Sequence, residues 1–416
     1  MHTIDVAVVG AGFAGLTAAA ELVGYGLDVE VFEARDRVGG KTESHIDQLG
    51  HPIDTGGQFV SDDMPHVRRL IEQQGKHLVP VHHDRAGQGF GASWDVFDAA
   101  EQAYSRLWSI DGVASPHATL GEWFDSLDVA PEVVDAARAT FGGVMCMPVD
   151  DIPLAHAVDL ARRTPLTRDE MQYIVAETIH RVAVDLAEPL TVHLTTPVQA
   201  IESDDDDGVV VRSHHRVVRA RHAVVAVPPS AYRTIAFDPP LPGFTAAAAH
   251  AFRPGSVIKF LARYARPFWR RPDIGATAMW LDPPGFYVGE ASPDDETFVL
   301  VGFLGGAATA RWWSMPSDAR RAAFIDRLIE AYGPDAAHPV SFVERDWAPD
   351  DWGGGGYWNV LVDAGQPDAV NVLRGGAPGI TFASTELSPA FPGYIEGAIT
   401  AGLAAAERVQ ALLDLR

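Results

Sequence analysis

The chain has 416 residues, 47% of them hydrophobic, which is enough for about two or three domains with cores of their own. The 32 Lys and Arg residues against 56 Asp and Glu give a net charge of −24, which argues against binding to nucleic acid or to an anionic membrane. The single cysteine, Cys146, excludes an internal disulfide and a cysteine-rich metal centre. Because there is no basic leader and no apolar run of roughly 18 residues, we expect a cytoplasmic protein without a membrane anchor.

The first elements form one strand–helix–strand unit. Residues 4–9 are β-branched and apolar, as in a strand buried on both faces, and run into Gly10-Ala11-Gly12-Phe13-Ala14-Gly15. An Ala/Leu-rich helix is predicted over 14–26, and a second short strand over 29–32 ends at Glu33. A glycine run between such a strand and helix is typical of a dinucleotide-binding turn.

The residue type at each key position of this motif has a physical reason. Gly10 permits the tight turn, Gly12 lets the backbone approach a pyrophosphate, and Gly15 lets the helix pack closely on the strand. The free N–H groups of the helix N-terminus face the phosphates, and the Glu33 carboxylate can accept hydrogen bonds from a ribose diol. The basic loop 34–42 either adds contacts to the same pyrophosphate or is a solvated turn.

Further along the chain, separated blocks resemble the flavin-containing amine oxidases, a family that includes monoamine and polyamine oxidases. The blocks occur in the family's order and span most of the chain: residues 8–15 with 33–40, 54–60 with a helix over 65–74, 196–201 with a strand over 223–229, 255–259 with 267–269, and 382–386 with 392–398.

The resemblance implies an interleaved fold of mixed α/β and α+β class. A Rossmann-like FAD-binding domain would be assembled from residues 1–78, 188–251 and 347–416. A mixed-sheet substrate-binding domain would take residues 79–187 and 252–346, where residues 82–116 lose strong periodicity. Residues 204–208 are predicted to form an acidic hairpin tip between two strands, a solvated turn rather than a calcium site.

The resemblance also implies FAD as the cofactor and a set of residues that bind it. These are Gly10, Gly12, Ala14, Gly15, Glu33, Ala34, Arg35, Gly40, Lys41, Gly57, Gln58, Phe59, Val198, Ser384, Glu386, Gly393, Tyr394 and Ile395. Lys41 and Ser384 depart from the family's usual arginine and glycine. Gly356 stands where monoamine oxidases carry the cysteine that bonds FAD, so we expect noncovalent FAD. No metal site is expected, because no histidine pair has metal-ligand spacing.

Lys259 is the strongest candidate for a direct role in the reaction. It lies in the apolar run Val257-Ile258-Lys259-Phe260-Leu261, where a buried ammonium is costly unless a partner or a function compensates. From the residues alone, an exposed position on an alternating strand is equally acceptable. By resemblance, it is the lysine that reaches flavin N5 through a water and assists reoxidation by oxygen.

Tyr357 and Tyr394 match the two positions of the family's aromatic cage, in which facing rings orient the amine nitrogen. Aromatic residues beside glycines also serve as ordinary packing. The loop after Gly57 has no arginine to hold a substrate carboxylate, which favours an amine over an α-amino acid. Asp62 and Asp63 either attract a second ammonium or cap the helix that begins at Pro65.

Together these features predict a FAD-dependent oxidation of a primary or secondary amine to an imine, with O2 reduced to H2O2. One alternative keeps the flavin in a dehydrogenase or desaturase of a biosynthetic intermediate that passes electrons to a non-oxygen acceptor. Another is a flavoprotein scaffold of low activity. The predicted partners are a small-molecule amine and O2, and the sequence leaves a homodimer open.

Overall fold

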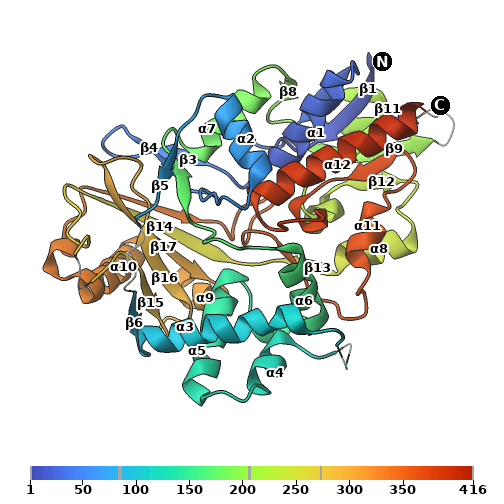
Figure 1. Ribbon diagram of the computed structural model, residues 1–416. Helices are drawn as coiled ribbons and strands as arrows, with labels where there is room; N and C mark the ends of the chain where they lie inside the picture. Colours follow the sequence, from blue (N-terminus) through green and yellow to red (C-terminus); the bar gives the residue numbers. More distant parts are fainter. Residues whose placement is uncertain are drawn as a thin grey trace.

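Two mixed β-sheets lie at the centre of the molecule, seen in a computed structural model as an upper and a lower layer (Figure 1). The structure describes residues 2–82, 87–113, 115, 117–204, 208–271 and 274–414. Within these ranges the first sheet has eight strands and the second has six. The predicted fold class is confirmed, since a parallel, helix-covered sheet is combined with a mainly antiparallel one.

The first sheet runs in the order β12-β9-β10-β11-β1-β2-β8, and β20 also pairs with β11. Its central strands are parallel, whereas β9, β10 and β11 form an antiparallel meander. The strands are β1 (His2–Val9), β2 (Val29–Phe32), β8 (Thr191–His193), β9 (Val198–Asp204), β10 (Gly208–Ser213), β11 (Val217–Val225), β12 (Ala236–Asp238) and β20 (Ile380–Phe382).

The predicted opening unit is confirmed as β1, helix α1 (Phe13–Gly24) and β2. Gly10 has a φ of 101°, which a side chain rarely adopts. A Cβ on Gly15 would lie 2.0 Å from the Gly10 carbonyl oxygen, so only glycine allows α1 to pack this closely on the strand. The two glycines therefore do what the motif requires.

Helices cover both faces of the first sheet. On one face, α1 packs with α2 (Pro65–Gln73), α7 (Ile179–Ala187) and the C-terminal α12 (Ile395–Asp414) in one core cluster. Helices α1 and α12, from the first and last parts of the chain, therefore lie side by side (Figure 1). On the other face lie α8 (Gly243–His250) and α11 (Ala369–Arg374).

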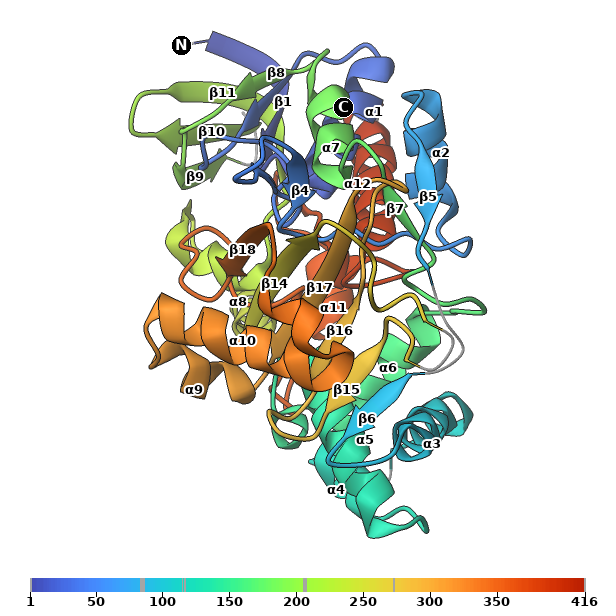
Figure 2. The same ribbon diagram turned by 90° about the vertical axis from the view of Figure 1, so that its left-hand side faces the viewer.

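The second sheet has the order β18-β14-β17-β16-β15-β6. Its strands are β6 (Gln88–Phe90), β14 (Val257–Tyr264), β15 (Ala278–Trp280), β16 (Phe286–Glu290), β17 (Phe298–Gly305) and β18 (Ser341–Asp346). Helices α9 (Ala308–Trp313) and α10 (Ser317–Tyr332) pack against it. A helical group lies at its other end (Figure 2): α3 (Trp94–Ser105), α4 (Leu120–Asp125), α5 (Pro131–Val144) and α6 (Leu154–Arg163).

Short elements connect these layers. Strands β3 (Ser44–Ile46) and β4 (Pro52–Asp54) form a local hairpin. Two other pairs link distant segments: β5 (Leu78–Pro80) with β7 (Tyr173–Val175), and β13 (Phe252–Pro254) with β19 (Asn359–Leu361). The short 3-10 helices are Arg106–Ser109, Val149–Asp151, Pro229–Thr234, Pro334–Ala337 and Thr385–Leu387.

The predicted domain boundaries stay a prediction. Helix α7, which they assign to the substrate-binding part, packs against α1 in the core of the first sheet. Strands β9 and β10 pair as the predicted hairpin, but residues 205–207 of its acidic tip lie outside the described residues. Among the described helices, none is long and apolar enough to cross a membrane.

Candidate functional site

The N-terminus of α1 lies beside two glycines, Gly12 and Gly40, which we call the glycine cradle. Gly12 is the N-cap residue of α1, and no side chain caps the helix. Glu33, which is 4% exposed, accepts hydrogen bonds from the Ala11 N–H at 2.7 Å and the Arg35 N–H at 2.9 Å. A Cβ on Gly12 would lie 3.7 Å from the Cα of Gly40. The predicted glycines, Glu33 and the loop after it thus meet at the uncapped helix end, a geometry suited to a phosphate.

Buried polar atoms without partners lie on the neighbouring segments. Among the described residues, the Ser384 Oγ, the Glu386 Oε2 and the Asn359 Nδ2 have no hydrogen-bond partner, although all three side chains are buried. The other oxygen of Glu386, Oε1, accepts from the Asn359 N–H at 2.8 Å. Leaving such groups unpaired costs about 1–3 kcal/mol each, so the site is built for a polar ligand. The hydroxyls and phosphates of FAD fit this set of donors and acceptors.

Lys41 and Gly356 meet beside this cradle. The Lys41 Nζ donates to the Gly356 carbonyl oxygen at 2.7 Å, and burial lowers the pKa of Lys41. A Cβ on Gly356 would lie 2.7 Å from the Cβ of Cys146 and 3.1 Å from its Sγ. Cys146 is 2% exposed, as expected for core packing, and it fills the space that a side chain at position 356 would need.

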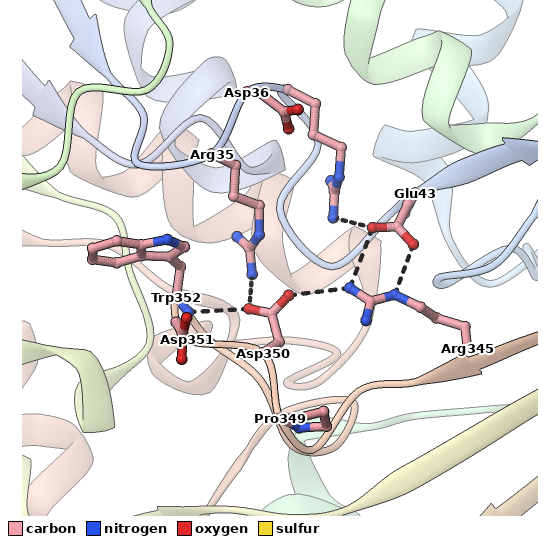
Figure 3. A pocket seen from close by; sticks show the side chains of 9 residues that line it. Arg35, Asp36, Glu43, Arg345, Pro349, Asp350, Asp351 and Trp352 are labelled. Atoms are coloured by element: carbon pink, nitrogen blue, oxygen red, sulfur yellow. Dashed lines mark hydrogen bonds and ion pairs between the residues drawn. The ribbon is translucent and has the colours of Figure 1, made fainter. Parts of the chain in front are cut away.

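An ion-pair network holds the loop after β18 against the loop after β2 (Figure 3). The Asp350 carboxylate accepts hydrogen bonds from Arg35 and, at 3.1 Å, from Arg345. Arg345 also donates to Glu43 at 2.8 Å, and Arg37 donates to the same carboxylate at 2.7 Å. These side chains line a surface pocket of about 310 Å³. Arg35 is thereby held close to the cradle.

Lys259 lies on β14 and is 2% exposed. All eight residues of this strand are buried, so the alternative of an exposed strand face is wrong. Its Nζ donates to the carbonyl oxygens of Asp54 at 2.8 Å and Gly56 at 2.7 Å, and also to the Gln58 side chain. Burial lowers the pKa of Lys259, and the nearby Asp54 carboxylate opposes this shift. The predicted Gln58 loop thus holds the predicted lysine.

An aromatic cluster extends from Lys259. The Lys259 Nζ lies 5.5 Å from the centre of the Phe303 ring, which lies 6.2 Å from that of Tyr357. The Tyr394 hydroxyl donates to the Glu170 carboxylate. Phe59, Tyr287 and Tyr357 each contact Phe303, and the Tyr394 hydroxyl interacts electrostatically with those of Tyr357 and Tyr104. We call these six residues the aromatic cluster.

The two predicted cage tyrosines are partly exposed, yet desolvation raises the pKa of both Tyr357 and Tyr394 well above the ordinary value. The negative charge of Glu170 also acts on both hydroxyls. The structure therefore brings Lys259, the two tyrosines and one carboxylate around the same aromatic cluster.

The other predicted cofactor residues lie on both sides of the cradle. A Cβ on Gly57 would lie 3.9 Å from the Ile395 side chain, and the Gly393 N–H donates to the Thr385 hydroxyl at 2.8 Å. Ala14 is buried in α1, and Ala34 is partly exposed after β2. Val198 starts β9 and packs in the core cluster on the α8 face of the first sheet.

The proposed capping of α2 by Asp62 or Asp63 is wrong. Met64 is the N-cap residue, and no side chain caps this helix. Asp63 instead accepts hydrogen bonds from the N–H groups of Thr167 at 2.6 Å and Arg168 at 2.8 Å. Asp63 thus binds a distant loop, because its carboxylate points away from the helix.

Three residues of the site were missed in the sequence. Glu170 lies in a polar stretch without periodicity, so no signal separates it from surface acids. Asn359 lies two residues after Tyr357, close to the glycine run, and this position was a usable signal in the sequence. The structure shows that its side chain is buried. Asp54 ends β4 and accepts from the Ile179 N–H at 2.9 Å, so it caps the N-terminus of α7.

Comparison with known proteins agrees with this geometry. The family described as flavin containing amine oxidoreductase matches residues 13–105 and 128–410. AofH of Mycobacterium tuberculosis, named as a flavin-containing monoamine oxidase, is 30% identical, with 99% of this chain and 97% of AofH covered. The putrescine oxidase of Kocuria rosea is 29% identical, with 97% of this chain and 94% of that protein covered.

A solved structure has the same fold over nearly the whole chain. The cyclohexylamine oxidase of Brevibacterium oxydans IH-35A is 27% identical, with a TM-score of 0.89 and 99% of both chains covered. The family match extends over Lys259 and the aromatic cluster, and the relatives and the shared fold cover nearly the whole chain. The chain is a member of the flavin-containing amine oxidase family.

Proposed function

We propose that this enzyme oxidises a primary or secondary amine to an imine and passes the electrons to O2, which becomes H2O2. The observation that carries the proposal is the position of the buried Lys259 beside Phe303 and Tyr357, with the Tyr394 hydroxyl hydrogen-bonded to a carboxylate, Glu170, that also acts on Tyr357. FAD, when bound, supplies the acceptor for a hydride from the carbon beside the amine nitrogen.

The residues of the chain have separate roles in this proposal. Tyr357 and Tyr394 orient the amine through the faces of their rings and keep water away from the reacting carbon. Lys259, whose Nζ donates to three oxygen acceptors, supplies in its protonated form a positive charge where oxygen is reduced. Glu33, Arg35 and the glycine cradle hold the dinucleotide, and Ser384, Glu386 and Asn359 hold its polar linker.

The cofactor is proposed to be noncovalent. The chain has one cysteine, and burial raises the pKa of the Cys146 thiol to about 12, which leaves it without the thiolate that a covalent bond needs. Gly356 offers no side chain. Heating or acid precipitation of the purified holoenzyme should release the flavin into the supernatant, and flavin that stays with the protein pellet would contradict this.

The substrate is proposed to be a small amine rather than an α-amino acid. The relatives named for putrescine and cyclohexylamine act on amines without a carboxylate, and the loop after Gly57 carries no arginine. O2 is the proposed acceptor because of Lys259. The two-part domain division, the cytoplasmic location and the lack of nucleic-acid or membrane partners stay predictions.

The test is turnover of an amine panel with two acceptors. Butylamine, cyclohexylamine, benzylamine and putrescine are supplied in air and under argon with an artificial electron acceptor. The proposal expects stoichiometric H2O2 and aldehyde or ketone in air. Turnover that needs the artificial acceptor and yields no peroxide would instead support a dehydrogenase.

A further inference from the structure

Glu170 is a carboxylate with an unusual environment. It lies between α6 and β7, and its Oε2 accepts a hydrogen bond from the Tyr394 hydroxyl. The titratable groups that act on it are Tyr394, its neighbour Asp169 and Glu101 of α3, and it acts in turn on Tyr104, Tyr287 and Tyr357. Among the described ion pairs, none joins Glu170 to a lysine, arginine or histidine.

Glu170 is partly buried, and an ionised carboxylate in such a place is destabilised when no cation is near. Burial raises the pKa of Glu170, and the negative charges of Asp169 and Glu101 raise it further. The Tyr394 hydrogen bond acts in the opposite direction, because it stabilises the ionised form. A cationic ligand beside the aromatic cluster would supply the missing positive charge.

The proposed reaction requires such a group. An alkylamine has a pKa of about 10.4, so at pH 7 only about one molecule in 2,500 is neutral, whereas hydride transfer needs the free electron pair on nitrogen. Lys259 is not the proposed acceptor, because its Nζ is directed at three oxygens that bind its N–H groups. The tyrosines stay protonated, since burial raises the pKa of each hydroxyl. Among the described residues around the cluster, Glu170 is the remaining acceptor.

We propose that Glu170 binds the ammonium group of the substrate and takes its proton, leaving the neutral amine between Tyr357 and Tyr394. In this step an N–H bond breaks, an O–H bond forms on Glu170, and the electron pair stays on nitrogen. No oxidant is consumed, because hydride transfer comes afterwards. The inference rests on the proposed function, and it assigns the substrate as an amine that arrives in its cationic form.

Binding of tert-butylamine to the holoenzyme tests this step without turnover, because this amine has no hydrogen on the carbon beside nitrogen. Calorimetry at pH 7.5 in two buffers of different ionisation enthalpy counts the protons released. Wild type should release close to none, since the proton moves to Glu170. Glu170→Gln should bind at least tenfold more weakly and release about one proton. Release of one proton by wild type, or absence of binding, would overturn the proposal.

The pH profile of kcat/KM is the second measurement. Wild type should stay active well below the pKa of the amine, whereas for Glu170→Gln the rate should fall nearly tenfold for each pH unit below it. Tyr394→Phe keeps the carboxylate but loses its hydrogen bond, so the acid limb should move to higher pH. Glu177→Gln removes an acid that pairs with His77 outside the cluster and should behave as wild type.

The outcomes separate the two proposals. If Glu170→Gln does not fold, an unmoved acid limb in Tyr394→Phe still overturns the role of Glu170. Profiles of the same shape for Glu170→Gln and wild type also overturn it, and leave amine oxidation intact. If wild type binds tert-butylamine without proton release and Glu170→Gln binds it more weakly with release of a proton, but no amine is oxidised, the proposed function fails and only cation binding at Glu170 is supported.

Discussion

Cys146 and Gly356 compete for one space, and this predicts how substitutions at the two positions combine. Gly356 has an ordinary backbone conformation, so Gly356→Ala is not strained by its φ. Its new Cβ would lie 2.7 Å from the Cβ of Cys146 and 3.3 Å from the Cα of Gly255, and distances below 3.0 Å essentially never occur. Overpacking of this kind costs about 1–3 kcal/mol.

Cys146→Gly should relieve the clash. Cys146 has a φ of 55°, a left-handed conformation that glycine adopts without strain, and the substitution also removes the Cβ and Sγ. We therefore expect the double variant Cys146→Gly/Gly356→Ala to be more stable than the sum of the single effects by at least about 1 kcal/mol.

The assay is urea unfolding of the four proteins without cofactor, followed by tryptophan fluorescence. Gly142→Ala in α5 is the matched control, because its Cβ would meet only the Met147 carbonyl oxygen at 3.5 Å, an ordinary contact. The control should be neutral or slightly stabilising. Strict additivity of the two substitutions, or a Gly356→Ala protein as stable as wild type, would refute the reasoning.

Three further predictions concern the site. Lys259→Met should keep the flavin but slow its reoxidation by oxygen at least tenfold, measured by stopped flow, and an unchanged rate would contradict the role of the lysine. Glu386→Gln should weaken retention of FAD about tenfold in equilibrium dialysis while unfolding as wild type does. Burial acts to raise the pKa of Asp350, but Arg35 and Arg345 hold this pKa below the ordinary value. The ionised Asp350 therefore stabilises the folded protein above about pH 4, and this contribution is lost on further acidification. Asp350→Asn should thus be about 1–3 kcal/mol less stable at pH 7 and approach wild type below pH 4, and a gap independent of pH would contradict this.

The parts predicted well from the sequence are those whose cause is local. The unit β1–α1–β2 follows from a buried strand, a glycine that needs a positive φ and an Ala/Leu-rich helix, all adjacent in the chain. The buried position of Lys259 is a local property of an apolar run, although the run alone did not exclude an exposed face. Helix α3 was not predicted, because its apolar positions are mixed with Asp, Glu and Gln.

The parts that escaped prediction depend on contacts between distant segments. Cys146 and Gly356 meet only because the end of α5 packs beside the loop before β19. Glu170 becomes special through Tyr394, which lies far along the chain. Asp63 looked like a helix cap by its position, yet its direction is set by the loop at Thr167. Contacts and side-chain directions of this kind depend on the tertiary structure and cannot be predicted from the local sequence pattern.

An anaerobic titration of the purified holoenzyme with amines tests the central claim most directly. The flavin absorbance near 450 nm is followed while benzylamine, cyclohexylamine or putrescine is added under argon. At least one amine should bleach the oxidised spectrum, and admitting air should restore it with formation of H2O2. A bound flavin that keeps its oxidised spectrum with every amine would contradict amine oxidation by this site.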